Sequence, residues 1–104
     1  MEKTDLSVIQ AAVLEGNYLY TAHALRRTTE RHISRAEIEQ GVARAEVIEN
    51  YPQDKYGPSV LLYGETDKKR ILHIQVSLPP SVKIITAYEP DPNQWEDYRV
   101  RKSE

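Results

Sequence analysis

The sequence predicts an α+β fold in which N-terminal helices pack on one face of a four-stranded antiparallel sheet. Apolar residues recur at helical spacing up to about residue 45, and beyond that point they alternate with polar residues, as they do in strands. The links at 52–58, 66–69 and 79–81 are short, which favours hairpins over the long crossovers that parallel strands need. A chain of 104 residues suits one hydrophobic core, so we expect a single domain over residues 1–104.

Three helices are expected in the first half of the chain, over about residues 4–16, 22–32 and 35–44. Asn17 to Tyr20 should form a short extended link between the first two. Ser34 and Glu37 have the spacing of a capping box, which predicts the start of the third helix. Gly41 lies within that helix and should let another element approach closely, because it has no side chain.

Four strands are expected in the second half, over residues 47–51, 59–64, 70–78 and 82–88. The third of them alternates most clearly, with Leu72 and Ile74 on one side and His73 and Gln75 on the other. A short C-terminal helix should hold Trp95. Because the helices should cover the apolar face of the sheet, the opposite face is where we expect chemistry.

The second helix gathers several polar side chains on one side. Spacings of three and four residues return to the same face of a helix, so these four fall within an arc of roughly 100°: His23, Arg27, Glu30 and Arg31. Leu25, Thr29 and Ile33 project from the far side, and we expect them to point toward the core. One face of this helix therefore presents an imidazole, two guanidiniums and a carboxylate.

The positive charge of the chain is concentrated around this helix. Residues 21–35 contain four Arg and one Glu, a net charge of +3, although the whole chain has a net charge of −2 at pH 7. Such a patch can attract a phosphate backbone. The alternative is a solvated helix face on which Glu30 neutralises its neighbouring arginines.

His73 is the second candidate for proton transfer. A histidine in the middle of a strand, on a half-polar face, can serve as a general acid or base. The alternative is a hydrogen-bonded histidine with a structural role in the sheet. Tyr88 and Lys83 lie in the neighbouring strand, and simple alternation puts their side chains on opposite faces, so at most one should join His73.

Several classes of site are disfavoured by composition. The chain has no cysteine, which excludes disulfides, thiolate zinc sites, iron–sulfur clusters and a cysteine nucleophile. Its three histidines lack the spacing of metal ligands, and no glycine-rich phosphate loop or serine-hydrolase motif occurs. We therefore expect neither a metal nor a cofactor. No signal peptide or membrane-spanning run is apparent, so a cytoplasmic location is expected.

The surviving residues suit metal-free cleavage of RNA. A histidine or carboxylate can deprotonate the ribose 2′-hydroxyl, arginines can stabilise the phosphate, and a second histidine can protonate the leaving oxygen. Exposed tyrosines can stack on unpaired bases. The same residues suit a non-catalytic module that binds nucleic acid or an acidic protein. A third hypothesis is a structural homodimer whose interface is formed by an exposed strand edge and by tyrosines.

Four strings of the sequence resemble a widespread family of small bacterial proteins that carry a domain of unknown function. They are YTAHALRRTTERHISRAEIEQGV, EVIENYP, RILHIQVSL and IITAYEPDPNQWEDYR. The family pattern is a His-Ala-x-x-Arg-x-x-x-Arg helix and a closing Tyr-Glu-Pro-Asp-Pro-x-x-Trp, and the resemblance covers about residues 18–99. That family in turn is similar to the RelE and MqsR group of toxins, whose N-terminal helices pack on an antiparallel sheet.

The resemblance implies a RelE-like fold and a toxin-like endoribonuclease, or mRNA interferase, of a type II toxin–antitoxin pair. It also implies a small antitoxin partner, often with a Cys-x-x-Cys zinc finger. Matched by motif, the catalytic set is His23 as general acid or base, Arg27 and Arg31 on the phosphate, His73 as second proton carrier and Tyr88 for positioning or stacking. Arg26, Arg35 and Lys83 are the further residues expected to contact RNA.

Overall fold

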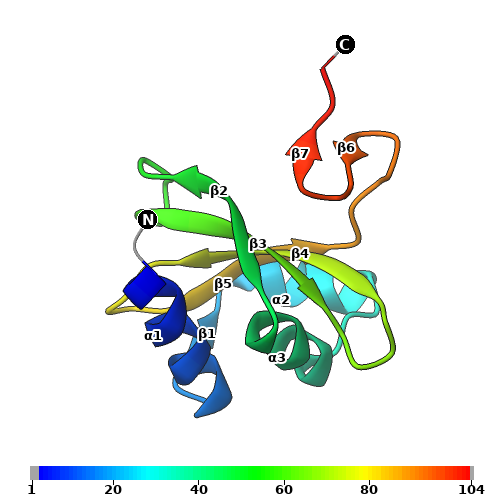
Figure 1. Cartoon of the computed structure of the whole chain (residues 1–104). Helices are drawn as coiled ribbons and strands as arrows, with labels where there is room; N and C mark the ends of the chain where they lie inside the picture. Colours follow the sequence, from blue (N-terminus) through cyan, green and yellow to red (C-terminus); the bar gives the residue numbers. More distant parts are fainter. Residues whose placement is uncertain (1–2, 104) are drawn as a thin grey trace.

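The computed structural model describes residues 3–103 and confirms the α+β class (Figure 1). Its helices are α1 (Lys3–Leu14), α2 (Ala22–Glu30) and α3 (Arg35–Ala43). Its strands are β1 (Leu19–Tyr20), β2 (Glu46–Tyr51), β3 (Ser59–Glu65), β4 (Ile71–Ser77), β5 (Lys83–Tyr88), β6 (Trp95–Glu96) and β7 (Val100–Arg101). No helix within these residues is long and apolar enough to cross a membrane.

The main sheet has five strands and is mixed, which corrects the expected four-stranded antiparallel sheet. Its order is β1-β5-β4-β3-β2, and only the β1–β5 pair is parallel. The expected link over residues 17–20 supplies the additional strand, because Leu19 donates its N–H to Val82 O (3.1 Å) and Thr21 donates to Ile84 O (3.0 Å). Two extended residues are enough to satisfy part of the open edge of β5.

Polar caps set the starts of α2 and α3. Thr21 accepts from Ala24 N at 3.0 Å, and Ser34 and Glu37 form the predicted capping box, with side-chain bonds in both directions. Helix α2 ends at Glu30, slightly earlier than expected, and His32 then adopts a φ of 54° that redirects the chain. The short turn between the two helices therefore begins at Arg31 and includes His32.

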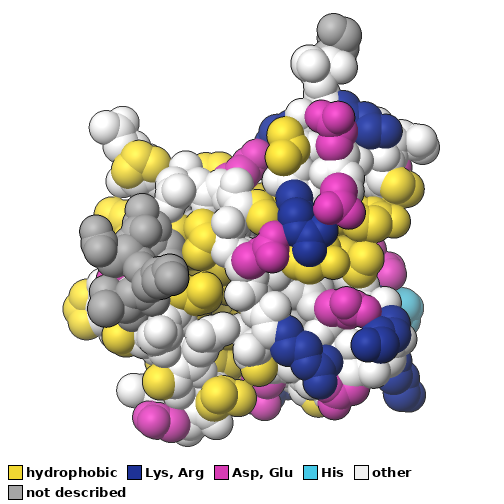
Figure 2. Space-filling model, in the orientation of Figure 1, with side chains coloured by type: hydrophobic (Ala, Val, Ile, Leu, Met, Phe, Trp, Pro, Cys, Tyr) yellow, Lys and Arg dark blue, Asp and Glu magenta, His cyan; other side chains and the backbone are white. Residues whose placement is uncertain are grey.

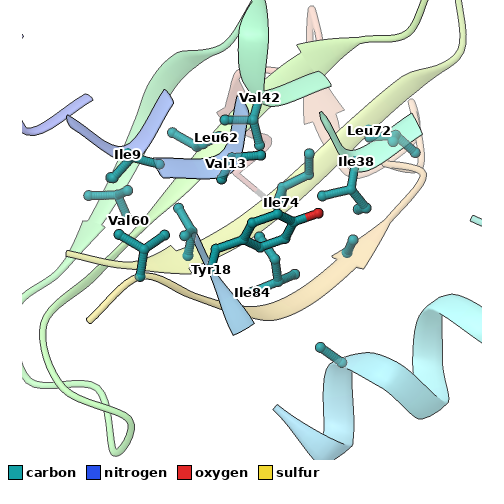
Figure 3. Close-up of a cluster of buried hydrophobic side chains, with 14 of the residues drawn as sticks. Ile9, Val13, Tyr18, Ile38, Val42, Val60, Leu62, Leu72, Ile74 and Ile84 are labelled. Carbon is teal, nitrogen blue, oxygen red and sulfur yellow. The ribbon is translucent and has the colours of Figure 1, made fainter. Parts of the chain in front are cut away.

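The hydrophobic core lies between the helices and one face of the sheet (Figure 3). Leu72, Ile74 and Val76 of β4 belong to it, which confirms the predicted alternation. The prediction for α2 is wrong at two positions: Ala24 and Thr28 face inward, whereas Leu25 is 60% exposed and Thr29 is exposed. The small side chains let α2 lie close to β5, and Thr28 satisfies its hydroxyl by donating to Ala24 O at 2.9 Å.

Helix α3 crosses β3 where two glycines meet. A Cβ built on Gly64 would lie 2.2 Å from Gly41 O, and one built on Gly41 would lie 3.1 Å from Ile74 Cδ1. The close approach predicted at Gly41 is thus confirmed, and its partner is the backbone of β3.

The C-terminal segment forms a β-hairpin, β6–β7, in place of the expected short helix. Residues 97–99 connect the two strands, the backbone N–H of Arg99 donates to Glu96 O at 3.0 Å, and the two residues between them, Asp97 and Tyr98, have φ of 51° and 58°. Positive φ at both central positions is what a tight type I′ hairpin turn requires, and neither residue is the glycine that would have indicated it. We call residues 95–101 the tail hairpin.

Candidate functional site

Most of the predicted site residues lie on or beside the sheet face that α1 and α3 leave uncovered. We call it the second face; it carries alternate residues of the central strands, namely Leu61, Tyr63, His73, Gln75, Thr86 and Tyr88. The tail hairpin lies on this side of the sheet (Figure 1). It covers the part around His73 and leaves the part around Gln75 beside α2.

His73 is sealed beneath the tail hairpin, with 0% of its surface exposed. Its Nε2 lies 2.6 Å from Tyr98 O, and because a carbonyl only accepts, Nε2 carries the proton and donates. Its Nδ1 then accepts from the Tyr88 hydroxyl at 3.3 Å. The Trp95 ring packs edge-on against the imidazole, with ring centres 4.4 Å apart. His73 thus joins the hairpin to the sheet and orients Tyr88.

Burial controls the protonation of this cluster. Removal from water lowers the pKa of His73, against the opposing effects of the Tyr98 carbonyl and Glu49, so the neutral imidazole is favoured. Burial likewise raises the pKa of Tyr88, so its hydroxyl stays protonated and can donate to His73. Both directions agree with the hydrogen bonds seen.

Ion pairs fasten the outer side of the tail hairpin to β2. Arg101 donates to both carboxylate oxygens of Glu49, at 2.9 and 3.2 Å, and its guanidinium lies 4.6 Å from the centre of the Trp95 ring. Burial disfavours ionised Glu49, but the hydrogen bonds from Arg101 and Tyr51 outweigh it and lower the pKa of Glu49. Arg99 pairs with Glu46 and stacks on Tyr63. The hairpin is therefore held by stacking and by charge.

The neutral state of buried His73 predicts a pH-dependent stability. The unfolded chain takes up a proton on His73 below about pH 6.5, whereas the folded chain resists it, so stability falls as the pH drops below that value. The loss continues down to the lowered folded pKa of His73, at no more than about 1.4 kcal/mol for each pH unit. Urea unfolding at pH 7.5 and 5.5 measures it.

The contributions of two other histidines and two carboxylates to the pH dependence of stability must be separated from that of His73. The doubly substituted chain His23→Gln, His32→Gln should keep the slope between pH 7.5 and 5.5. The pKa values of Glu37 and Glu49 are lowered from 4.5, so their contributions are lost only at lower pH. A flat stability in the double variant would show that His73 is not held neutral.

A β-bulge corrects the prediction that Lys83 and Tyr88 point to opposite faces. Val76 pairs with Ile84, whereas Gln75 pairs with Thr86, so Ile85 is an additional residue in β5. The additional residue reverses the alternation, and Tyr88 pairs directly with His73. Lys83 falls on the same second face, at the opposite end of the strand.

The arginines around α2 have separate surroundings. Arg31 donates to Ala87 O at 2.9 Å, which satisfies the edge of β5 beyond β1. Arg27 pairs with Glu30 at 2.9 Å on the exposed side, and Arg26 is exposed. Arg35 turns away from this group: it stacks on Tyr18 with 4.8 Å to the ring centre and contacts Glu39. The structure thus brings Arg26 and Arg27 together with His23 on one helix and separates Arg35 from them.

His23 lines a groove on the open part of the second face. The groove has a volume of about 190 Å³ and lies between α2, the loop after β2 and the strands β4 and β5. Its lining, which we call the α2 groove, consists of His23, Asp54, Lys55, Tyr56, Gln75, Ile85 and Thr86. Larger hollows of about 270 and 460 Å³ beside α3 contain none of the predicted site residues.

The loop residues of the α2 groove were missed by the sequence prediction. Asp54, Lys55 and Tyr56 belong to a segment that reads only as a polar link, and no motif marks them. Gln75 was a groove residue that the sequence could have indicated, because strand alternation places it on the same face as His73. Contact between residues 23, 54 and 75 depends on tertiary packing, which periodicity does not show.

On the face of the molecule shown in Figure 2, acidic side chains lie beside most of the basic ones, so the surface carries mixed charge. This agrees with the ion pairs Arg44–Asp67, Arg70–Glu37 and Arg99–Glu46. Among residues 3–103, no group of three or more His, Asp or Glu side chains is arranged to hold a metal ion.

Comparison with known proteins gives one family. A family model described as domain of unknown function DUF4258 matches residues 20–89, well over half of the chain. The chain belongs to the DUF4258 family. No curated protein and no solved structure matches it. Membership of a family of unknown function is thus confirmed, whereas the expected family motifs and the similarity to RelE and MqsR stay predictions.

The DUF4258 match spans the elements that build the α2 groove. It runs from Tyr20 to Glu89 and so includes α2, α3 and β2 to β5. Helix α1 and the tail hairpin lie outside it. The groove therefore belongs to the family domain, whereas the cover over His73 is supplied by the segment that follows.

Proposed function

We propose that this DUF4258 protein is a toxin-like, metal-independent endoribonuclease of a type II toxin–antitoxin pair, and that the α2 groove is its active site. The observation that supports this most is the placing of His23. The imidazole lines a groove with a carboxylate, an ammonium, an amide and a phenol, and Arg26 and Arg27 follow one turn later on the same helix.

These groups match the chemistry of RNA cleavage through the 2′-hydroxyl. His23 exchanges a proton with the reacting oxygens. Arg27 can exchange its ion pair with Glu30 for a phosphate. An exposed ion pair on a helix contributes little to stability, whereas a guanidinium forms bidentate hydrogen bonds with a phosphate. Lys55 adds positive charge within the groove, exposed Arg26 follows His23 on the same helix, and the Tyr56 ring offers a surface on which a base can stack.

Two of the predicted catalytic residues take positioning roles in this proposal. His73 is covered by the tail hairpin and does not line the α2 groove, so its role is to hold Tyr88 and the hairpin in position. Arg31 holds the edge of β5 through Ala87 O. Lys83 shares the second face and keeps its proposed contact with RNA, whereas Arg35 lies elsewhere.

The proposal includes a small antitoxin with a Cys-x-x-Cys zinc finger as the partner, and a cytoplasmic location. A neighbouring gene for such a protein is the first thing to look for. Co-expression should restore growth if the pair exists, and the two proteins should co-purify.

The decisive variant is His23→Ala. We expect the purified protein to cut a mixed-sequence RNA in the presence of EDTA, and His23→Ala to reduce the rate by about 10²-fold or more, the usual contribution of a proton-transfer group. Expression of the native chain should arrest growth, and expression of the variant should not. His32→Ala is the matched control, since His32 is an exposed histidine after the same helix.

Other outcomes separate the alternatives. RNA binding without product, weakening as salt increases, would identify a binding module. Equal cleavage by the native chain and His23→Ala would remove His23 from the mechanism. A native chain that neither binds nor cuts RNA would overturn the proposal.

A further inference from the structure

The α2 groove contains a second titratable side chain that can take part in proton transfer. Asp54 is half-buried, and it is the carboxylate among the residues that line the groove with His23. We infer that Asp54 is the general base that deprotonates the ribose 2′-hydroxyl, and that His23 is the general acid toward the leaving 5′-oxygen. This inference rests on the proposed ribonuclease function.

The carboxylate of Asp54 is held from two sides. Gln75 of β4 donates its Nε2 to Oδ1 at 3.2 Å, and the backbone N–H of Tyr56 donates to Oδ2 at 3.0 Å. Gln75 is itself fixed, because the same Nε2 donates to Ser59 Oγ of β3 at 3.0 Å. Each carboxylate oxygen has more than one acceptor site, so these bonds leave capacity for a substrate hydroxyl. A loop carboxylate is thus anchored to the sheet.

The other carboxylate and the other imidazole on the second face, Glu49 and His73, are bonded outside the groove. Glu49 is bound by both Arg101 and Tyr51, and His73 and Tyr88 bond each other beneath the tail hairpin. Lys55 lines the groove beside Asp54, with Nζ 5.2 Å from the centre of the Tyr56 ring, and carries positive charge that suits a phosphate. Asp54 and His23 are left as the pair that faces a substrate in the groove.

The reaction follows from this pair. Asp54 takes the proton of the 2′-hydroxyl, and the 2′-oxygen forms a bond to the adjacent phosphorus. The bond from phosphorus to the 5′-oxygen breaks, and protonated His23 gives its proton to that oxygen. The products are a 2′,3′-cyclic phosphate and a 5′-hydroxyl, and no other reactant is needed. The substrate class is therefore RNA with a free 2′-hydroxyl at the cleaved position, and DNA is excluded.

A sulfur substitution in the substrate separates the two roles. When the leaving 5′-oxygen is replaced by sulfur, the thiolate leaves without a proton, so the general acid becomes dispensable while the base is still required. We would measure single-turnover cleavage of a short RNA and of its 5′-sulfur analogue by the full chain. The variants are Asp54→Asn and His23→Ala, with Asp67→Asn as control, because Asp67 is an exposed aspartate that pairs with Arg44 outside the groove.

We expect Asp54→Asn to lose about 10²-fold or more on both substrates. His23→Ala should lose as much on ordinary RNA and recover most of its rate on the sulfur analogue, and Asp67→Asn should match the native chain. Thermal unfolding of each variant checks that the fold is kept, and Asp54→Glu gives a second variant in which partial activity is expected.

The results distinguish this inference from the proposed function. If the native chain cuts RNA but Asp54→Asn keeps its rate, the ribonuclease stands and Asp54 is not the base. If Asp54→Asn, and not His23→Ala, recovers on the sulfur analogue, the two roles are exchanged and the inference fails. A native chain that cuts neither substrate overturns both.

Discussion

Replacing Gly64 by alanine should strongly destabilise the protein. The new Cβ would lie 2.2 Å from Gly41 O and 2.6 Å from its carbonyl carbon. Both are backbone atoms, so no side-chain rotation relieves the overlap, and α3 must move away from β3. Overpacking of this kind costs about 3 kcal/mol or more, a large part of the stability of a small domain. Urea unfolding followed by circular dichroism measures it.

Gly41→Ala is the matched comparison on the facing element. Its Cβ would meet Ile74 Cδ1 at 3.1 Å, the end of a side chain that can turn, and alanine favours a helix by about 1 kcal/mol over glycine. The two effects oppose each other, so we expect a change within about 1 kcal/mol of zero. If Gly64→Ala were as stable as Gly41→Ala, the close packing of α3 on β3 would be wrong.

The parts of the fold that the sequence predicts are those set by local chemistry. The Ser34–Glu37 capping box and the alternation around Ile74 both depend on neighbours within a few residues, and both are confirmed. The buried face of α2 was mispredicted. Hydrophobicity favours Leu25 in the core, whereas close contact with β5 requires the smaller side chains of Ala24 and Thr28. Size at a close contact outweighed hydrophobicity there.

The larger errors come from pairing between distant segments. Leu19 and Tyr20 become a strand only because β5 offers an open edge, and the bulge at Ile85 shows only in the register with β4. The tail hairpin turns at Asp97 and Tyr98, whose positive φ is supported by the bond from His73 to Tyr98 O. None of these features has a local signal in the chain.

The candidate site was predicted in part for the same reason. His23 and Arg27 share a helix, so their common face follows from spacing alone, and the structure keeps them together. Asp54 enters the groove through a loop and Gln75 through a strand, and only folding brings them to His23. The exposure of His73 could not be read from its strand, because the residues that cover it lie more than twenty positions later.

Replacing His73 by phenylalanine should release the tail hairpin from the sheet. Phenylalanine keeps a flat ring against Trp95 but removes both hydrogen bonds, and the Tyr98 carbonyl and the Tyr88 hydroxyl lose their partner. Leaving two partly buried polar groups unsatisfied costs about 2–6 kcal/mol for the two together. Detaching the hairpin exposes them to water at a lower cost, so we expect local opening before global unfolding.

Trp95 reports this opening directly, because it is the one tryptophan of the chain and only 4% exposed. In His73→Phe its emission should shift to longer wavelength, and trypsin should cut within residues 99–102 while the far-ultraviolet dichroism stays native. His32→Phe, at an exposed histidine, should change none of these. A buried Trp95 and unchanged stability in His73→Phe would show that the hydrogen bonds do not hold the hairpin.

The same variant separates a positioning role for His73 from proton transfer. A proton carrier contributes about 10²–10⁴-fold to the rate, whereas loss of a group that orients Tyr88 from beneath a cover should cost less than about 10-fold. We therefore expect His73→Phe to cut RNA within that limit while its hairpin is open, and to keep the pH–rate profile of the native chain. A loss of 10²-fold or more with the α2 groove intact would return His73 to the catalytic set and require the tail hairpin to open in the working enzyme.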